Sequence, residues 1–161
     1  MRGVNKRVIL PDFGRFFRTN NRRPIDFTCR DGANLLHDFV YLRSYLHDAS
    51  FEMKSVKRNG RVLRIRLQRE RWELQKRSDG LENISSELII TPVVSMKWQS
   101  KSRIGSKGKF FVRDVYLGES IWDATDRAEV VLSGFGRKPT QLRIVVQDPF
   151  EVRLRDIAGE K

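Results

Sequence analysis

The sequence contains one cysteine, Cys29, among 161 residues. A single cysteine cannot form an internal disulfide, so the disulfide scaffolds of small secreted domains are excluded and nothing indicates an oxidising compartment. Long apolar runs are missing as well. Val8-Ile9-Leu10 stops at Pro11, far short of a signal-peptide core, and no stretch approaches the roughly 18 apolar residues of a membrane span. We therefore expect a cytoplasmic protein that makes no membrane contact.

Signatures of common catalytic sites are equally scarce. No glycine run closes on a lysine followed by serine or threonine, as a P-loop requires, and no serine-hydrolase elbow occurs. The two histidines stand in His37-Asp38 and His47-Asp48. A helix between them would separate their imidazoles by roughly 15–20 Å, too far for one metal ion unless the chain reverses sharply. We therefore predict no enzyme, no metal and no cofactor.

His47 and Asp48 form the one candidate polar site. Two interpretations stay open at this point. His47 can close the end of a helix, where a cation suits the helix dipole, while Asp48 caps or pairs locally. Alternatively, His47 can act as a ligand or general base, with His37 or Asp48 completing the group.

What is present is the composition of a globular chain, with 39% hydrophobic and 32% charged residues. The length is that of one ordinary domain with a single core. We predict one domain over residues 1–161, with a basic N-terminal arm at 1–30 and a flexible basic loop at 100–109. In the arm, phenylalanines alternate with arginines, so it can stack on bases or, as the favoured interpretation, pack on the core.

A helix is predicted at residues 34–46, after the turn-forming pair Asp31-Gly32, with Asp31 or Asn34 as its cap. Arg43 falls within the apolar arc of this helix and should either extend to its rim or pair with a carboxylate. Apolar residues recur there at three- and four-residue steps: Leu35, Leu36, Phe39, Leu42 and Leu46.

A β-hairpin is predicted directly after the helix. Phe51 and Met53 alternate with charged residues, and so do Leu63, Ile65 and Leu67 beyond Asn59-Gly60, a pair typical of a type I′ turn.

Further strands are predicted in the second half of the chain. A strand is predicted near 88–98. Because Pro92 cannot donate a hydrogen bond to a neighbouring strand, this strand either lies at an edge of the sheet, has a bulge near Pro92, or begins after it. Three short strands follow near 130–132, 142–146 and 150–154. The predicted class is α+β, with a mainly antiparallel, strongly twisted sheet or half-barrel of about six to eight strands and one main helix.

The net charge is +12 and the basic residues come in blocks, which favours an acidic partner, either protein or nucleic acid. Arginines on the solvent face of the hairpin can follow a phosphate backbone, or simply keep the sheet soluble and its edge unpaired. The candidate binding residues are Arg58, Arg61, Arg64, Arg66, Lys101, Arg103, Lys107 and Lys109.

Residues 35–67 resemble small uncharacterised bacterial domains, some of which are thought to act as immunity proteins against polymorphic toxins. The resemblance lies in the helix, in the junction Leu46-His47-Asp48-Ala49 and in the hairpin with Leu63-Arg64-Ile65-Arg66-Leu67. The basic arm and the 100–109 loop are departures from them. The resemblance implies a non-catalytic binding protein, and the residues favour the same class. The alternative is a nucleic-acid-binding protein that uses the basic hairpin face and the basic loop.

Overall fold

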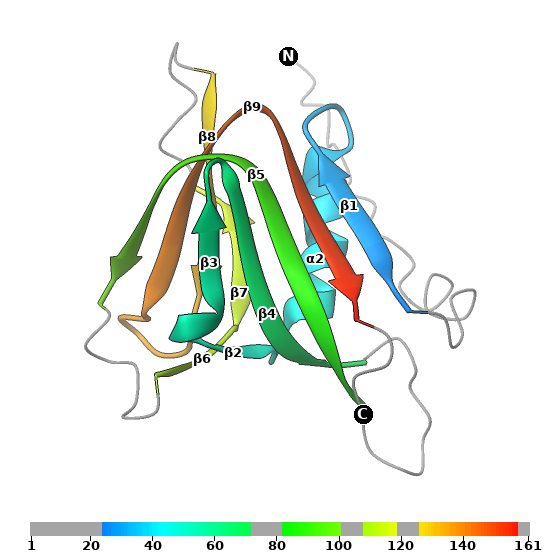
Figure 1. The fold of residues 1–161 in the computed structure, drawn as a ribbon, viewed down its shortest axis with the longest axis vertical. Coiled ribbons are helices and arrows are strands. Elements are labelled where there is room, and N and C mark those ends of the chain that lie inside the picture. Colours follow the sequence, from blue (N-terminus) through cyan, green and yellow to red (C-terminus); the bar gives the residue numbers. More distant parts are fainter. Residues whose placement is uncertain (1–23, 72–81, 101–107, 119–125, 158–161) are drawn as a thin grey trace, which may run out of the picture.

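The computed structural model describes residues 24–71, 82–100, 108–118 and 126–157 (Figure 1). In these residues nine strands form one antiparallel sheet, and one α-helix lies against it. Seven strands follow the order β6-β2-β4-β5-β9-β8-β7, while β1 pairs with β9 and β3 with β4 beside this path. The strands are β1 (Asp26–Arg30), β2 (Ser50–Glu52), β3 (Val56–Asn59), β4 (Val62–Glu70), β5 (Asn83–Gln99), β6 (Lys109–Phe111), β7 (Asp114–Leu117), β8 (Arg127–Ser133) and β9 (Gln141–Asp156). The predicted α+β class with a curled antiparallel sheet is confirmed.

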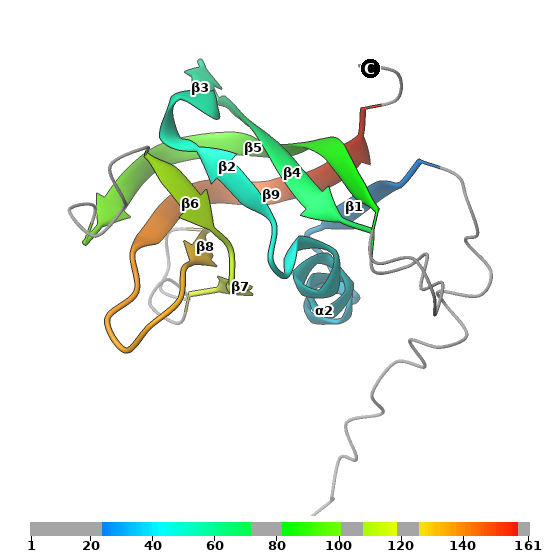
Figure 2. The ribbon, with the colours of Figure 1, turned by 90° about the horizontal axis from the view of Figure 1, so that it is seen from below.

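Helix α2 (Leu35–Leu46) lies within the curve of the sheet, packed against β1, β4 and β7 (Figure 2). The predicted length of the helix is confirmed, but one residue was wrongly assigned to its apolar face. Leu36 is 73% exposed and Tyr45 is buried instead. At 100° per residue the buried side chains centre near Leu42, and Leu36 projects roughly 110° away from that centre.

Polar contacts at the ends of α2 differ partly from expectation. Asn34 is the N-cap but makes no side-chain cap hydrogen bond, and the carboxyl group of Asp31 bonds to Asp148 instead. The predicted side-chain cap is therefore wrong. Arg43 pairs with a carboxylate, since its Nε lies 2.8 Å from Oδ1 of Asp114.

The predicted hairpin is present as β3 and β4, with three corrections. Asn59 pairs with Val62, so the two-residue loop is Gly60-Arg61, one position later than predicted. Only Gly60 has a positive φ there, which fits a type II′ turn with glycine first rather than a type I′ turn. The predicted strand through Met53 also ends early, because residues 53–55 form a 3-10 turn (η1, Met53–Ser55) between β2 and β3.

The two long strands β5 and β9 bend together (Figure 1), and the pairing between them is interrupted around Pro92 and Pro149. β5 runs through Pro92 and lies between β4 and β9, so the predicted edge position is wrong, while the predicted bulge is confirmed by register shifts on either side of Val93. β9 joins two of the three predicted short strands into one strand that passes through Pro149. Proline has no N–H to donate, so pairing is interrupted in both strands at the same bend.

The predicted N-terminal arm is partly a strand. Its last residues form β1, which pairs with β9, whereas residues 1–23, with the aromatic and arginine stretch, lie outside the described residues. Cys29 in β1 is fully buried, and this burial raises the pKa of its thiol to about 12. The cysteine is therefore a core residue and not a reactive thiol.

An ion pair lies inside the core. Arg69 continues the buried face of β4, and its Nη2 and Nε lie 2.7 and 2.9 Å from the two carboxylate oxygens of Asp156. Both side chains are 0% exposed. Burial opposes ionisation of Asp156, but hydrogen bonds from Arg69, the Ser86 hydroxyl and the Ile25 amide outweigh it, so the pKa of Asp156 lies below its ordinary value. The pair ties β4, β5 and β9 to the start of β1.

Carboxylates crowd at the bend of β9. The side chain of Asp148 is hydrogen-bonded to that of Asp31 and is repelled by Asp31 and Asp126, and together with lost hydration these contacts raise its pKa to about 6. The folded protein therefore holds a proton that the unfolded chain releases above its ordinary pKa of 3.8. The stability that this proton contributes is lost as pH rises from 3.8 through about 6.

We expect Asp148→Asn to be more stable than the wild type at about pH 7.5, because the substitution removes the repulsion. The gain should stay below about 1 kcal/mol, since water screens these partly exposed groups. At about pH 4 the wild type is protonated there and the difference should vanish. Urea unfolding at both pH values measures this, and a gain of equal size at the two values would contradict it.

Candidate functional site

Two of the predicted binding residues, Arg58 and Arg61, lie at the tip of the hairpin and make different contacts. Arg58 donates to the backbone: its Nε lies 2.9 Å from the Gly60 carbonyl, and its Nη2 lies 3.3 and 3.1 Å from the carbonyls of Val93 and Val94. These bonds hold the tip against β5 just after the Pro92 bulge. Arg61 is exposed, and its backbone carbonyl accepts the Val93 N–H at 2.7 Å. Arg58 thus has a structural task in addition to any contact with a partner.

The outer face of the sheet, opposite α2, carries charged side chains in cross-strand rows. One row runs from Arg66 on β4 through Glu87 and Arg155 to Asp26 on β1. On the part of this face formed by β1, β3, β4, the first half of β5 and the last half of β9, six cations stand with four carboxylates: Lys57, Arg64, Arg66, Arg153, Arg155 and Arg30 with Glu87, Asp26, Glu151 and Glu70. Because strands alternate their faces, Leu63, Ile65 and Leu67 point to the core, as predicted.

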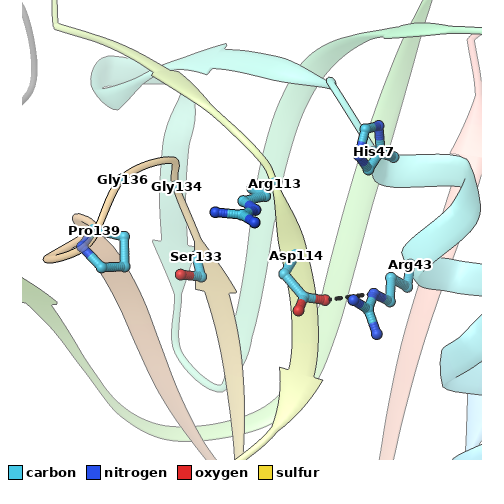
Figure 3. Close-up of a pocket in the computed structure, with 8 residues that line it drawn as sticks. All are labelled: Arg43, His47, Arg113, Asp114, Ser133, Gly134, Gly136 and Pro139. Atoms are coloured by element: carbon cyan, nitrogen blue, oxygen red, sulfur yellow. Dashed lines mark ion pairs between the residues drawn. The ribbon is translucent and has the colours of Figure 1, made fainter.

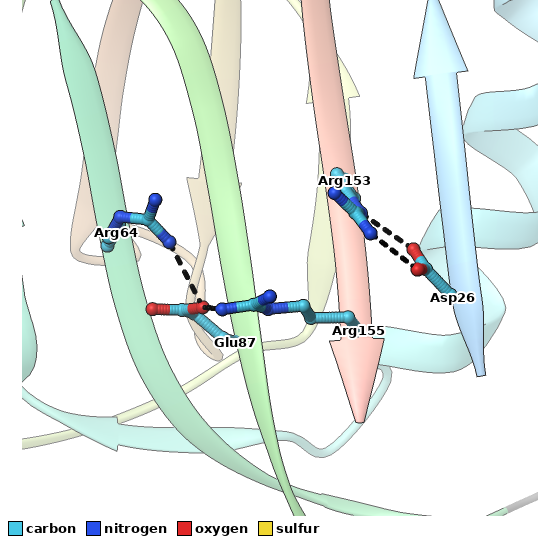
Figure 4. A network of polar contacts seen from close by, with 5 residues as sticks. All are labelled: Asp26, Arg64, Glu87, Arg153 and Arg155. Carbon is cyan, nitrogen blue, oxygen red and sulfur yellow. Dashed lines mark hydrogen bonds and ion pairs between the residues drawn. The ribbon is translucent and has the colours of Figure 1, made fainter. Parts of the chain in front are cut away.

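Carboxylates pair with most of these arginines (Figure 4). Glu87 accepts from Arg155 at 2.6 and 2.9 Å and from Arg64 at 3.2 Å. Burial opposes its ionisation, but the two arginines prevail, so the pKa of Glu87 lies below its ordinary value. Arg153 holds both oxygens of Asp26, and this hydrogen bonding lowers the pKa of Asp26. The outer face is therefore a mixture of charges with a small positive excess.

A groove of about 290 Å³ opens where β2 separates from β4. Ser50 is the one β2 residue paired with β4. The next two residues, Phe51 and Glu52, pair only with β6, and the chain then turns away through η1. The Ser55 hydroxyl lies 2.7 Å from the Glu52 carbonyl and 2.8 Å from the Arg66 carbonyl, which fixes this turn beside the opening. The lining residues are Ser50, Phe51, Glu52, Lys54, Ser55, Arg66, Leu67, Gln68 and Lys109.

The groove brings together two of the predicted binding residues. Arg66 comes from β4 and Lys109 from β6, and Lys54 from η1 adds a third cation whose Nζ lies 2.7 Å from Oε2 of Glu52. Beside them the ammonium of Lys109 lies 5.3 Å from the ring centroid of Phe111, which is 50% exposed. The other predicted residues, Lys101, Arg103 and Lys107, lie outside the described residues, in the segment that leads into β6.

The His47-Asp48 junction is a type II turn. The Ala49 N–H donates to the Leu46 carbonyl at 3.0 Å, and His47 and Asp48 have φ values of −58° and 62°. Nδ1 of His47 lies 3.1 Å from Oδ2 of Asp48. His37 lies on the first turns of α2 and contacts its own neighbour Asp38 at 3.9 Å. The two histidines are thus separated along the helix, and Asp48 pairs locally.

We expect Asp48→Ala to lower the free energy of unfolding by about 1 kcal/mol, since alanine resists a positive φ. Asp48→Gly should change it by less than about 0.5 kcal/mol, because glycine adopts that conformation without steric cost. Urea unfolding of both variants measures the difference. If the glycine variant is the less stable of the two, the contact with His47 rather than the backbone makes the contribution.

His47 also lines a cavity of about 410 Å³ (Figure 3). Ser133 is the one hydroxyl residue among the lining residues that the structure describes, and it lies across the cavity from His47, with Arg113 between them. A histidine that activates a serine must stand within hydrogen-bond reach of it. In the described part of the chain, no group of three or more His, Cys, Asp or Glu side chains has the arrangement of a metal site.

Comparison of the chain with protein-family models, with curated proteins and with solved structures finds no match. Within the ranges that the structure describes, no helix has the length and apolar character that crossing a membrane requires.

Proposed function

We propose that this protein is a small cytoplasmic binding module without catalytic activity that recognises an acidic segment of a partner protein. The binding site in this proposal is the groove between β2 and β4, together with the adjoining arginines of the outer face. The observation that carries it is the convergence of Arg66, Lys109 and Lys54 from three separate elements on one opening. The resemblance of residues 35–67 to small bacterial domains points to the same class.

The charge pattern favours a protein partner over a phosphate backbone. A nucleic-acid duplex presents a uniform row of negative charges, and proteins that bind it neutralise phosphates with clustered cations. On the outer face, carboxylates instead stand between the arginines, as Glu87 does between Arg64 and Arg155. Such carboxylates repel a uniform row of phosphates, whereas an acidic protein segment can place its carboxylates opposite the cations alone, so that each position contributes to the choice of partner. The apolar floor formed by Phe51 and Leu67 can also bury a side chain of the partner.

A test compares two double variants that remove the same charge. Arg66→Gln with Lys109→Gln changes the groove, whereas Arg127→Gln with Arg137→Gln changes two exposed cations outside it. With a glutamate-rich peptide as probe in about 50 mM salt, we expect the groove variant to lose about tenfold or more in affinity. The control variant should bind within about twofold of the wild type. Equal losses would show general electrostatic attraction and contradict the proposal.

Nucleic-acid binding is the second candidate function. Its supporting observation is the exposed ring of Phe111 beside Lys109, since bases stack on such rings while cations hold phosphates. If about six cations contact phosphates, log affinity for duplex DNA should fall with log salt at a slope near −5. An oligonucleotide that binds more tightly than the glutamate-rich peptide, and loses affinity in Phe111→Ala, would favour this candidate. Failure to bind any DNA or RNA at about 50 mM salt would remove it.

A further inference from the structure

A second concave site lies between the end of α2 and the connection from β8 to β9 (Figure 3). It shares no residue with the groove. Its volume of about 410 Å³ falls in the range of small-molecule sites, about 300–1,000 Å³. The lining residues are Arg43, His47, Arg113, Asp114, Ser133, Gly134, Gly136 and Pro139.

Two guanidinium groups face this pocket against one carboxylate. Arg43 pairs with Asp114, with its Nε 2.8 Å from Oδ1, and its side chain is still 60% exposed. Arg113 is exposed, and none of the carboxylates in the described ranges forms an ion pair with it. The carbonyl end of α2 disfavours an anion weakly, but guanidinium groups at short range outweigh a helix terminus because they form charge-assisted, two-pronged hydrogen bonds.

An aromatic ring lies beside the cation. The guanidinium carbon of Arg113 lies 6.0 Å from the ring centroid of Phe135, and Phe135 is 53% exposed although it is large and apolar. Its neighbours fix the loop: a Cβ on Gly134 would stand 3.3 Å from the Phe110 ring and from the Thr140 carbonyl, and Gly136 has φ +103°. The backbone of this loop is therefore closely packed on the core. Phe135 is not itself a lining residue, but its ring lies against the guanidinium of Arg113, which lines the pocket.

We propose that this pocket binds a small phosphate ester that carries a planar ring. Arg113 and Arg43 hold the phosphate oxygens, since guanidinium groups match oxyanions in geometry as well as charge. The Phe135 ring stacks on the ring of the ligand, and the volume exceeds what an inorganic phosphate alone would fill. The site is independent of the groove, so either can fail without the other.

Phenyl phosphate and inorganic phosphate serve as probes, with binding measured by calorimetry and by NMR shifts of the labelled protein. We expect phenyl phosphate to bind more tightly than inorganic phosphate and to shift signals of Arg113, Phe135 and Gly136. Arg113→Gln should weaken phenyl phosphate about tenfold or more, and Arg113→Lys should weaken it less because the charge remains.

Arg137→Gln is the matched control, because Arg137 is an exposed arginine of the same loop that does not line the pocket. It should leave the affinity for phenyl phosphate unchanged. Phe135→Leu should abolish the preference for phenyl phosphate over inorganic phosphate. The proposal is overturned if phenyl phosphate does not bind, if its shifts map elsewhere, or if Arg137→Gln weakens binding as much as Arg113→Gln. Equal affinity of the wild type for the two probes would overturn the part that Phe135 plays.

Discussion

Arg69→Met is expected to lower the free energy of unfolding by about 3–5 kcal/mol, because it leaves the fully buried carboxylate of Asp156 without its charge partner. The Ser86 hydroxyl and the Ile25 amide would remain bonded to Asp156, but two neutral donors do not replace a guanidinium. Arg69 also lies 5.6 Å from the Tyr45 ring of α2, so this contact between sheet and helix would be lost as well. Chemical denaturation followed by circular dichroism measures the effect.

Two controls define the origin of this loss. Arg69→Met combined with Asp156→Leu removes both charges and should recover most of the stability, since a well-packed apolar pair often equals a buried ion pair. Arg64→Met breaks an ion pair that is exposed on the outer face and should cost less than about 1 kcal/mol. If the double variant is no more stable than Arg69→Met, packing volume rather than the uncompensated charge explains the loss.

The same pair makes stability depend on acid. The pKa of Asp156 is lowered in the folded protein, so its contribution is present above the ordinary pKa of the carboxyl group and is lost as pH falls through the folded value. This sign is opposite to that of Asp148. In the double variant, the part of the acid-induced loss of stability that comes from Asp156 should be absent.

Phe110→Ala should have an effect of similar size, about 3–5 kcal/mol. The Phe110 ring is 3% exposed and its centroid lies 5.0 Å from that of Phe51 and 5.7 Å from that of Trp98, so its removal leaves a cavity beside these two aromatic rings. Phe111→Ala is the matched control. That neighbouring ring is 50% exposed, and its removal should change stability by about 0.5 kcal/mol or less.

Denaturation midpoints of the two variants give this comparison directly. Gly134 packs on the Phe110 ring, so Phe110→Ala should also loosen the loop that positions Phe135. A smaller loss in Phe110→Ala than in Phe111→Ala would mean that β6 does not close the core in the way described.

Local patterns were enough to predict the helix and the hairpin. Period-three-and-four spacing identified α2, and alternation identified the buried face of β4, because both patterns arise within one element. Leu36 was assigned to the core because spacing alone does not reveal where the apolar arc is centred. Only packing against β1, β4 and β7 places Tyr45 inside and Leu36 in solvent.

Features made by distant pairing could not be predicted. Alternation places Arg69 on the buried face of β4, a signal that could have identified it, but its partner Asp156 belongs to the last strand of the sheet. Arg66 and Lys109 were both selected as basic residues, yet their shared groove depends on β2 pairing with β6. Arg113 and Phe135 had no distinguishing signal in the sequence, because their proximity requires the fold.

The most direct measurement for the proposed function is NMR mapping of a glutamate-rich peptide on the isotope-labelled protein, repeated at increasing salt. We expect the largest shifts at the groove, in Lys54, Arg66 and Lys109, with smaller shifts along the outer face at Arg64. Changes at these positions should keep their ranking as salt weakens the binding, because the groove rather than the total charge selects the peptide. Shifts spread evenly over all exposed cations, or confined to residues remote from the groove, would contradict the proposed binding site.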